Sequence, residues 1–163
     1  MRILGVDPGS LVTGWGVVDG RGSRIEGVDA GILRLQRDLP LEERLRLVHV
    51  GLTEVVAQHG PGAFAVEDIF YAKHANAAIK LGHVRGVALL VAAESGLPVH
   101  SYAPSLVKRT VTGRGRADKR QVAQLVGAIL GWKELPPIDA TDALAVAITH
   151  AQAARATAAG GQR

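Results

Sequence analysis

The sequence contains no cysteine and few aromatic residues: two Trp, two Tyr and two Phe among 163 residues. The lack of cysteine excludes disulfide bonds and thiolate metal sites. Long hydrophobic runs are also missing. The longest, GVALLVAA at residues 86–93, is far shorter than the roughly 20 apolar residues that cross a bilayer, so we expect no membrane span. No basic and then apolar leader precedes the first strand pattern, and we therefore expect a cytoplasmic protein.

Neither sign of charge dominates the chain as a whole. Nineteen Lys and Arg residues stand against fifteen Asp and Glu, which gives a net charge of +4 and permits a polyanionic partner without requiring one. The distribution is more informative, because the segment KRTVTGRGRADKR holds one acid, Asp118. Its basic residues are Lys108, Arg109, Arg114, Arg116, Lys119 and Arg120. This local basic patch could hold phosphates.

The length fits one domain with a single hydrophobic core. We expect that domain to span residues 1–150 and the Ala- and Gly-rich residues 151–163 to be a frayed tail. Hydrophobic periodicity and turn residues predict an α/β fold, with an antiparallel meander of three strands followed by further strands and helices. The predicted strands are 2–6, 14–18, 23–33, 63–68 and 97–102, and the predicted helices are 41–59, 76–94, 117–130 and one from 139.

Four acids lie at positions where α/β folds commonly have their active sites. Asp7 and Glu67 end two apolar strands, and the carboxyl ends of strands form the sites of open α/β sheets. Asp139 and Asp142, in the motif DATDA, share one face at the start of the last helix. Each acid alone has an ordinary explanation as a turn former, a helix cap or a partner of the helix dipole. Those explanations do not account for Glu67. A helix cap needs only one of Asp139 and Asp142, so capping does not explain both.

Clustered carboxylates without histidine or cysteine ligands favour a hard cation such as Mg²⁺ or Mn²⁺. Two such ions about 4 Å apart can activate a water and stabilise the leaving oxygen of a phosphodiester. The basic patch would then hold the flanking phosphates. This combination predicts a nuclease.

The chain resembles the RuvC family of bacterial Holliday junction resolvases, which have an RNase H-like fold with a mixed five-stranded sheet flanked by helices. The resemblance extends from the N-terminus to about His150 and rests on four blocks in the family's order: ILGVDPGSLVTGWGVV, AVEDIFYAKHANAAIKLGHVRGVALL, YAPSLVKRTVTGRGRADKRQV and DATDALAVAITH. It implies a metal-dependent endonuclease that resolves four-way DNA junctions by paired nicks in recombination and repair. It also implies the RuvA and RuvB branch-migration machinery as partners.

The resemblance assigns roles to individual residues. Asp7, Glu67, Asp139 and Asp142 resemble the family's acidic tetrad that binds divalent metal, although Asp139 stands where some members have His. Lys108 and Lys119 match lysines near the scissile phosphate, and Lys119 is also a catalytic candidate. Phe70 matches an aromatic that stacks on unpaired bases, a task that Tyr71 could share; a core position for Phe70 is the alternative. The remaining predicted DNA contacts are Arg114, Arg116 and Arg120.

The helix at 76–94 is apolar almost all round in its second half, which is more than one buried face can absorb. Gly82 and Gly86 are four residues apart and could let a second helix approach. A merely buried helix is the alternative. The resemblance implies a homodimer through this helix, and we predict Ile79, Gly82, His83 and Gly86 at the interface.

Three rival functions remain open from the sequence. A strand followed by Asp, Gly and Ser also opens the phosphate loop of actin-like ATPases and sugar kinases, but those need two lobes around the nucleotide. A RuvC-like nuclease with a simpler nucleic-acid substrate would have the same metal chemistry. A junction-binding module without catalysis would gain nothing from acids that face phosphates.

Overall fold

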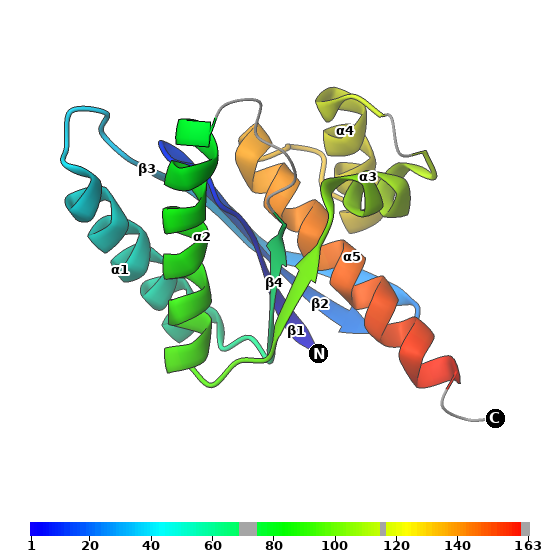
Figure 1. The fold of residues 1–163 in the computed structure, drawn as a ribbon. Coiled ribbons are helices and arrows are strands. Elements are labelled where there is room, and N and C mark those ends of the chain that lie inside the picture. The colour runs from blue at the N-terminus through cyan, green and yellow to red at the C-terminus, as the bar shows by residue number, and fades with distance from the viewer. Residues whose placement is uncertain (69–74, 115–116, 161–163) are drawn as a thin grey trace.

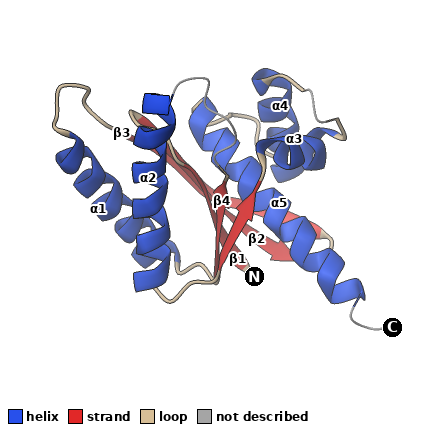
Figure 2. Ribbon diagram, in the orientation of Figure 1, coloured by secondary structure: helices blue, strands red, loops and turns tan. Residues whose placement is uncertain are grey.

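The computed structural model of the chain describes residues 1–68, 75–114 and 117–160. Within them lies one mixed sheet with the strand order β3-β2-β1-β4-β5 (Figure 2). β1 pairs antiparallel with β2 and parallel with β4, and β5 extends the parallel half. The strands are β1 Arg2–Asp7, β2 Val12–Arg21, β3 Arg24–Arg34, β4 Ala63–Glu67 and β5 Val99–Tyr102. The predicted α/β fold class, with its meander and its parallel strands, is confirmed.

Helices cover both faces of the sheet (Figure 1). On one face lie α1 and α2, which contact each other, and on the other face α5 runs across β1 and β2 with α3 and α4 beside it. The helices are α1 Leu41–His59, α2 Ala75–Glu94, α3 Pro104–Thr112, α4 Lys119–Leu130 and α5 Ile138–Gly160. We call the side covered by α5 the α5 face and the opposite side the α1 face.

Strict alternation along the strands produces two hydrophobic clusters. In β1, Ile3 packs under α5 while its neighbour Leu4 packs under α1, and both are fully buried. α5 supplies the core of its own face, including Leu144 and Ile148, which are also fully buried. Apart from a bulge in the β2–β3 ladder at Val17 and Val18, side chains alternate between the faces, so the register of the sheet decides which face each strand-end residue reaches.

Several elements differ from the sequence-based prediction, and α3 was not predicted as a helix. β2 and β3 form a longer ladder than expected, ending in the pair Arg21 and Arg24. α4 begins at Lys119 rather than at residue 117, because Asp118 is its N-cap. The predicted frayed tail needs correction: α5 continues as a helix to Gly160, and Ala151 packs against the core. Alanine has the highest helix propensity, so an alanine-rich end extends a helix already begun.

Candidate active site

Asp7 is the last residue of β1, and strand alternation directs its side chain to the α5 face, as at Gly5. A buried threonine closes the loop that follows. The hydroxyl of Thr13 donates to the carbonyl of Gly9 at 3.1 Å, and the Gly9 N–H donates to Thr13 Oγ1 at 3.4 Å. The loop is therefore held at both ends, which fixes where the Asp7 carboxylate stands.

Glu67 ends β4, the strand next to β1. The parallel register pairs Val6 with Val66, so Asp7 and Glu67 follow at the same level on neighbouring strands. Adjacent strands lie about 4.8 Å apart, and both side chains point to the α5 face. As expected from the sequence, the two strand-end acids are neighbours at the carboxyl edge of the sheet.

The other two acids arrive on α5, which crosses the sheet in very close contact. A Cβ on Gly14 of β2 would overlap the carbonyl oxygen of Asp139, and a Cβ on Gly5 would overlap that of Ala143. Only glycine therefore lets the start of α5 lie directly on β1 and β2. This approach brings Asp139 and Asp142 over the end of β1.

The four acids converge at one place. Asp7, Asp139 and Asp142 each offer a carboxylate oxygen within 4.8 Å of the others. Glu67 lines a cavity of about 190 Å³ together with Asp7 and Asp142. All four are partly buried. We call these four residues the acidic cluster.

Crowding and burial make this cluster costly to ionise. Burial, with the nearby charges of Glu67 and Asp142, raises the pKa of Asp7 to about 8. Burial first and Asp142 second also raise the pKa of Glu67 above its usual range. A bound divalent cation would remove this cost, and a site of carboxylate oxygens alone suits a hard cation. The donor set therefore fits the metal that the sequence predicts.

Lys119 stands beside the cluster because of a capping box at the start of α4. The Asp118 carboxylate accepts from the Gln121 N–H at 2.9 Å, and the Asp118 N–H donates to Gln121 Oε1 at 3.2 Å. Lys119, the first residue of the helix, then donates through Nζ to Asp142 Oδ2 at 2.8 Å. This contact raises the pKa of Lys119, so the ammonium stays charged.

For the other predicted phosphate contacts, the structure gives the position in the fold and the exposure. Lys108 of α3 lines the same cavity as the acids. Arg114 and Arg120 are exposed near the two ends of the α3–α4 connection. Phe70, Tyr71 and Arg116 lie outside the described residues, and their predicted roles stay predictions.

Sequence reasoning missed Arg85 of α2, which holds the end of β4. Its guanidinium Nη2 lies 2.9 Å from Asp68 Oδ1 and donates to Ser101 Oγ at 2.8 Å, and its Nε donates to the Glu67 carbonyl at 3.4 Å. Arg85 thus fixes the backbone of a cluster residue from the opposite layer. The available signal in the sequence was an arginine directly before the apolar run GVALLVAA.

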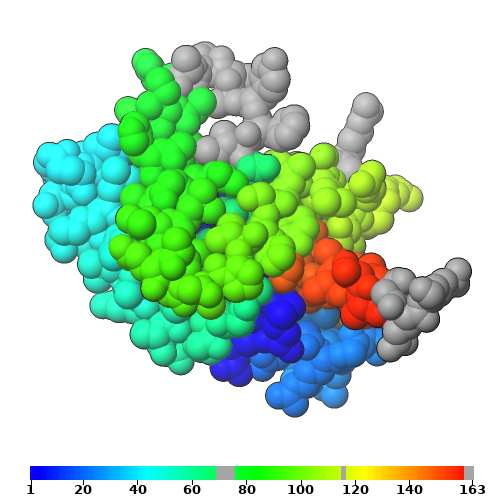
Figure 3. All heavy atoms as spheres, turned by 60° about the horizontal axis from the view of Figure 1, so that its bottom comes forward, coloured from blue at the N-terminus to red at the C-terminus, as the bar shows by residue number. Residues whose placement is uncertain are grey.

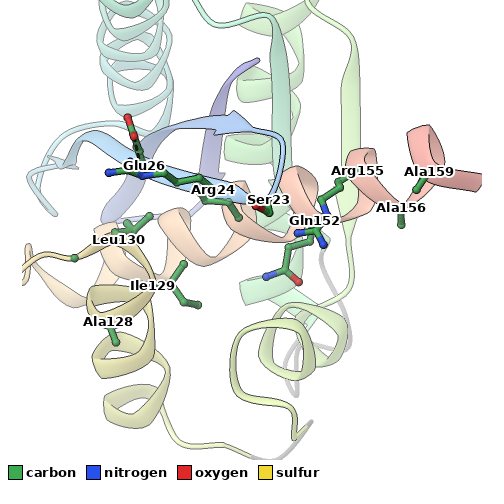
Figure 4. Close-up of a pocket in the computed structure, with 12 residues that line it drawn as sticks. Ser23, Arg24, Glu26, Ala128, Ile129, Leu130, Gln152, Arg155, Ala156 and Ala159 are labelled. Carbon is green, nitrogen blue, oxygen red and sulfur yellow. Dashed lines mark ion pairs between the residues drawn. The ribbon is translucent and has the colours of Figure 1, made fainter.

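A larger cavity lies elsewhere and lacks this chemistry. It measures about 810 Å³ and opens between the β2–β3 hairpin, α4 and the end of α5 (Figure 4). Its one carboxylate, Glu26, is paired with Arg24 at 2.9 Å. This cavity is larger, but its single carboxylate already forms an ion pair and cannot make a metal or acid–base site. We therefore place the candidate active site at the acidic cluster.

Comparison with known proteins shows the family of the chain. The family model "Crossover junction endodeoxyribonuclease RuvC" matches residues 3–150. A protein of that name from Methylorubrum populi is 50% identical over 151 residues, which cover 93% of this chain and 80% of the relative. Its counterpart from Citrifermentans bemidjiense is 48% identical over 154 residues, covering 94% of each chain.

Solved structures show the same relation. Thermus thermophilus RuvC in complex with a Holliday junction substrate is similar with a TM-score of 0.90 and 38% identity, over 96% of each chain. The yeast mitochondrial resolvase Ydc2 shares the fold at a TM-score of 0.66 and 12% identity, over 95% of this chain and 80% of that one. With a family model matched over nearly its whole length and relatives near 50% identity, the chain belongs to the RuvC family of crossover junction endodeoxyribonucleases.

Proposed function

We propose that this chain is a metal-dependent endonuclease that resolves four-way Holliday junctions by paired symmetric nicks. The observation that carries the proposal is the convergence of Asp7, Asp139 and Asp142, with Glu67 in the same cavity, in a member of the RuvC family. A phosphodiester strand presented to this cavity meets both the acids and the lysines that line it. Recombination and repair are the processes that need this reaction.

Asp7, Glu67, Asp139 and Asp142 are the residues that would hold the cation, which we propose to be Mg²⁺ or Mn²⁺ in two copies per site. When bound, such ions lower the pKa of an attacking water and stabilise the leaving oxygen. The chain's own contribution is orientation. Thr13 and the Gly9 carbonyl hold the loop after Asp7, and Arg85 holds the backbone at Glu67.

Lys119 and Lys108 supply positive charge at the mouth of the cavity. An ammonium there attracts a phosphate oxygen and stabilises the negative charge that grows during hydrolysis. Arg114 and Arg120 extend the same charge outward along the α3–α4 side, where they can hold flanking phosphates. Binding through phosphates is largely independent of base sequence, and we expect it to weaken with salt.

The outer face of α2 is the proposed dimer interface. A groove of about 440 Å³ runs along it, lined by Leu45, Ile79, Gly82, His83, Gly86, Val87 and Leu90. Ile79 is 58% exposed and Leu90 is 50% exposed, while a Cβ on Gly82 or Gly86 would meet nothing within 4 Å. Figure 3 shows α1 and α2 side by side on the surface. A two-fold dimer would match the two equivalent strands of a four-way junction.

The helix segment Asn76–Glu94 is long and apolar enough to cross a membrane, judged by length and composition alone. The sequence prediction of no membrane span considered only uninterrupted apolar runs. In the structure one face of α2 packs into the core, with Val84, Ala88 and Val91 buried. A second copy of the chain accounts for the other face. This assignment agrees with a cytoplasmic location, which we propose together with RuvA and RuvB as partners.

A dimer-breaking variant tests the interface. Gly82→Glu combined with Gly86→Glu places charges in the groove without crowding the monomer, since both positions are open. We expect a dimer of the native chain and a monomer of the variant in sedimentation experiments. Nicking by the variant should yield singly nicked junctions. Ala93→Glu, an exposed change on the same helix, is the control and should stay dimeric. A variant that remains dimeric would place the interface elsewhere.

The substrate is tested with a synthetic four-way junction and a linear duplex of the same sequence, each with Mg²⁺. We expect nicks at symmetric positions in two opposite strands of the junction and an intact linear duplex. Equal cleavage of the linear duplex would favour the simpler nuclease that the sequence left open. Cleavage of neither, together with ATP hydrolysis, would favour the kinase-like alternative.

A further inference from the structure

A second positive surface lies on the side of the acidic cluster away from the lysines. Lys108 of α3 and Lys119 of α4 line the cavity beside Glu67, the residue that ends β4. The opposite side is bounded by β2 and β3, and by the loop that joins β3 to α1. Arg34 and Arg37 lie there, and both are exposed.

The register of the sheet places Arg34 relative to Asp7. Asp7 pairs with Gly14, and Gly14 pairs with Ile32, so these three residues lie in one row and share the α5 face. Arg34 is two residues beyond Ile32 and therefore points to the same face. Two strand spacings and two residues of rise put its Cα roughly 12 Å from that of Asp7.

The contact between α5 and Gly14 shows that this row of residues faces α5. The backbone at Asp139 lies directly on Gly14, the middle residue of the row. Arg34 therefore stands just outside the first turn of α5, on the β3 side. Lys119 pairs with Asp142 on the other side. The acids lie between a pair of lysines and an arginine.

Arg37 lies in the turn that follows β3, three residues beyond Arg34. The Leu35 N–H donates to the Leu11 carbonyl at 2.8 Å, which ties this loop to the one that follows Asp7. Arg44 of α1 reinforces the connection, because its Nη1 donates to the Ser10 carbonyl at 3.1 Å. The two loops are therefore tied to each other and to α1.

The lack of an ion pair distinguishes Arg34 and Arg37 from four other arginines of the described residues. The arginine ion pairs among the described residues engage Arg2, Arg24, Arg46 and Arg85, and none of those pairs includes Arg34 or Arg37. Asp38 is the nearest acid in sequence and is exposed as well. Two guanidinium groups without an ion pair in the described part of the chain, on the β3 side of the acidic cluster, suit a phosphate-bearing ligand.

We infer that Arg34 and Arg37 contact backbone phosphates of the junction strand where it leaves the acidic cluster on the β3 side. The inference rests on the proposed function, since the strand must first occupy the cluster. At one phosphate per about 3.4 Å of rise, the separation from Asp7 corresponds to three or four nucleotides. The lysines and these arginines then hold the strand on both sides of the cut.

The test measures junction binding as a function of salt in an Asp7→Asn background, which removes cleavage. Arg34→Ala with Arg37→Ala is the test variant. Arg21→Ala with Arg24→Ala is the matched control, because these two exposed arginines stand at the far end of the same hairpin. The ten residues of β2 separate the two ends, a distance of about 30 Å.

We expect the slope of log Kd against log salt to fall by about 1 for each phosphate that the variant no longer holds, so by about 2 in the test variant. Affinity at low salt should drop about tenfold or more, and the control should match the background in slope and affinity. Unchanged melting temperatures will show that both variants fold.

Equal slopes for the test variant and the background would overturn the inference while leaving the proposed function intact. An equal drop in affinity in the test and control variants would also overturn it, because the effect would then reflect net charge alone. Failure of the background protein to prefer a junction over a linear duplex would overturn the proposed function, and this inference with it.

Discussion

Replacing Asp7 by Asn is expected to abolish nicking of a four-way junction while leaving junction binding unchanged or tighter. The substitution removes a carboxylate ligand from the centre of the acidic cluster and one negative charge from beside the DNA phosphates. Removal of a residue that only supports a metal ligand costs about 10- to 100-fold, so removal of a ligand itself should exceed about 100-fold in rate.

Single-turnover cleavage and a binding titration on the same junction separate the two effects. Glu54→Gln, an exposed acid on α1, is the matched control and should cleave normally. Nicking by Asp7→Asn at the native rate would remove Asp7 from the site, and with it the proposed location of catalysis.

The same variant should be more heat-stable than the native chain when no metal is present. A carboxyl whose pKa rises to about 8 on folding favours the fold only while it is protonated. That contribution is complete below the unfolded pKa of about 4 and is lost as the pH rises toward 8. Asparagine has no such dependence on pH, so the difference in melting temperature should be small at pH 4 and several degrees at pH 8. Added Mg²⁺ should raise the melting temperature of the native chain more than that of the variant.

A single methyl group at Gly14 is expected to damage both stability and catalysis. The new Cβ in Gly14→Ala would overlap the Asp139 carbonyl, which is backbone and cannot rotate away. Overpacking of this kind costs about 1–3 kcal/mol, or roughly 2–12 °C in melting temperature for a chain of this length. The start of α5 must also shift, and a displacement of about 1 Å at a catalytic group can cost about 100-fold in rate.

Gly20→Ala is the matched control on the same strand. Its Cβ would lie 3.5 Å from the Ala151 Cβ and 3.7 Å from the Met1 carbonyl, both ordinary contacts. Thermal melting and nicking assays should therefore find it close to native. A Gly14→Ala protein with native stability and native nicking would show that α5 does not depend on this close approach.

Much of the architecture could be predicted from local patterns. The alternation of apolar residues at spacings of four and three predicts a helix over 41–59, and the structure has α1 at those limits, Leu41–His59. Asp7 and Glu67 could be predicted as neighbours because each ends an apolar strand, and β1 and β4 pair in parallel at the same edge of the sheet. Such features depend on residues close in sequence, which is why periodicity and turn residues suffice for them.

Features that depend on packing between distant segments could not be predicted. Gly14 looks like an ordinary strand glycine until α5 is placed on it. Arg85 acts on the end of β4 from 18 residues away, across two layers of the fold. Arg34 lies outside the basic patch in sequence and joins the rim of the site only through the register of β3. In each case the partner is chosen by tertiary packing.

The ion pair between Lys119 and Asp142 has a consequence for how the enzyme is switched into its working form. A divalent ion held by Asp142 would compete with the Lys119 ammonium for this carboxylate and would weaken the ion pair. The lysine side chain is 63% exposed, so it could then turn toward a backbone phosphate of the DNA. Metal binding and DNA binding would be coupled through this one side chain.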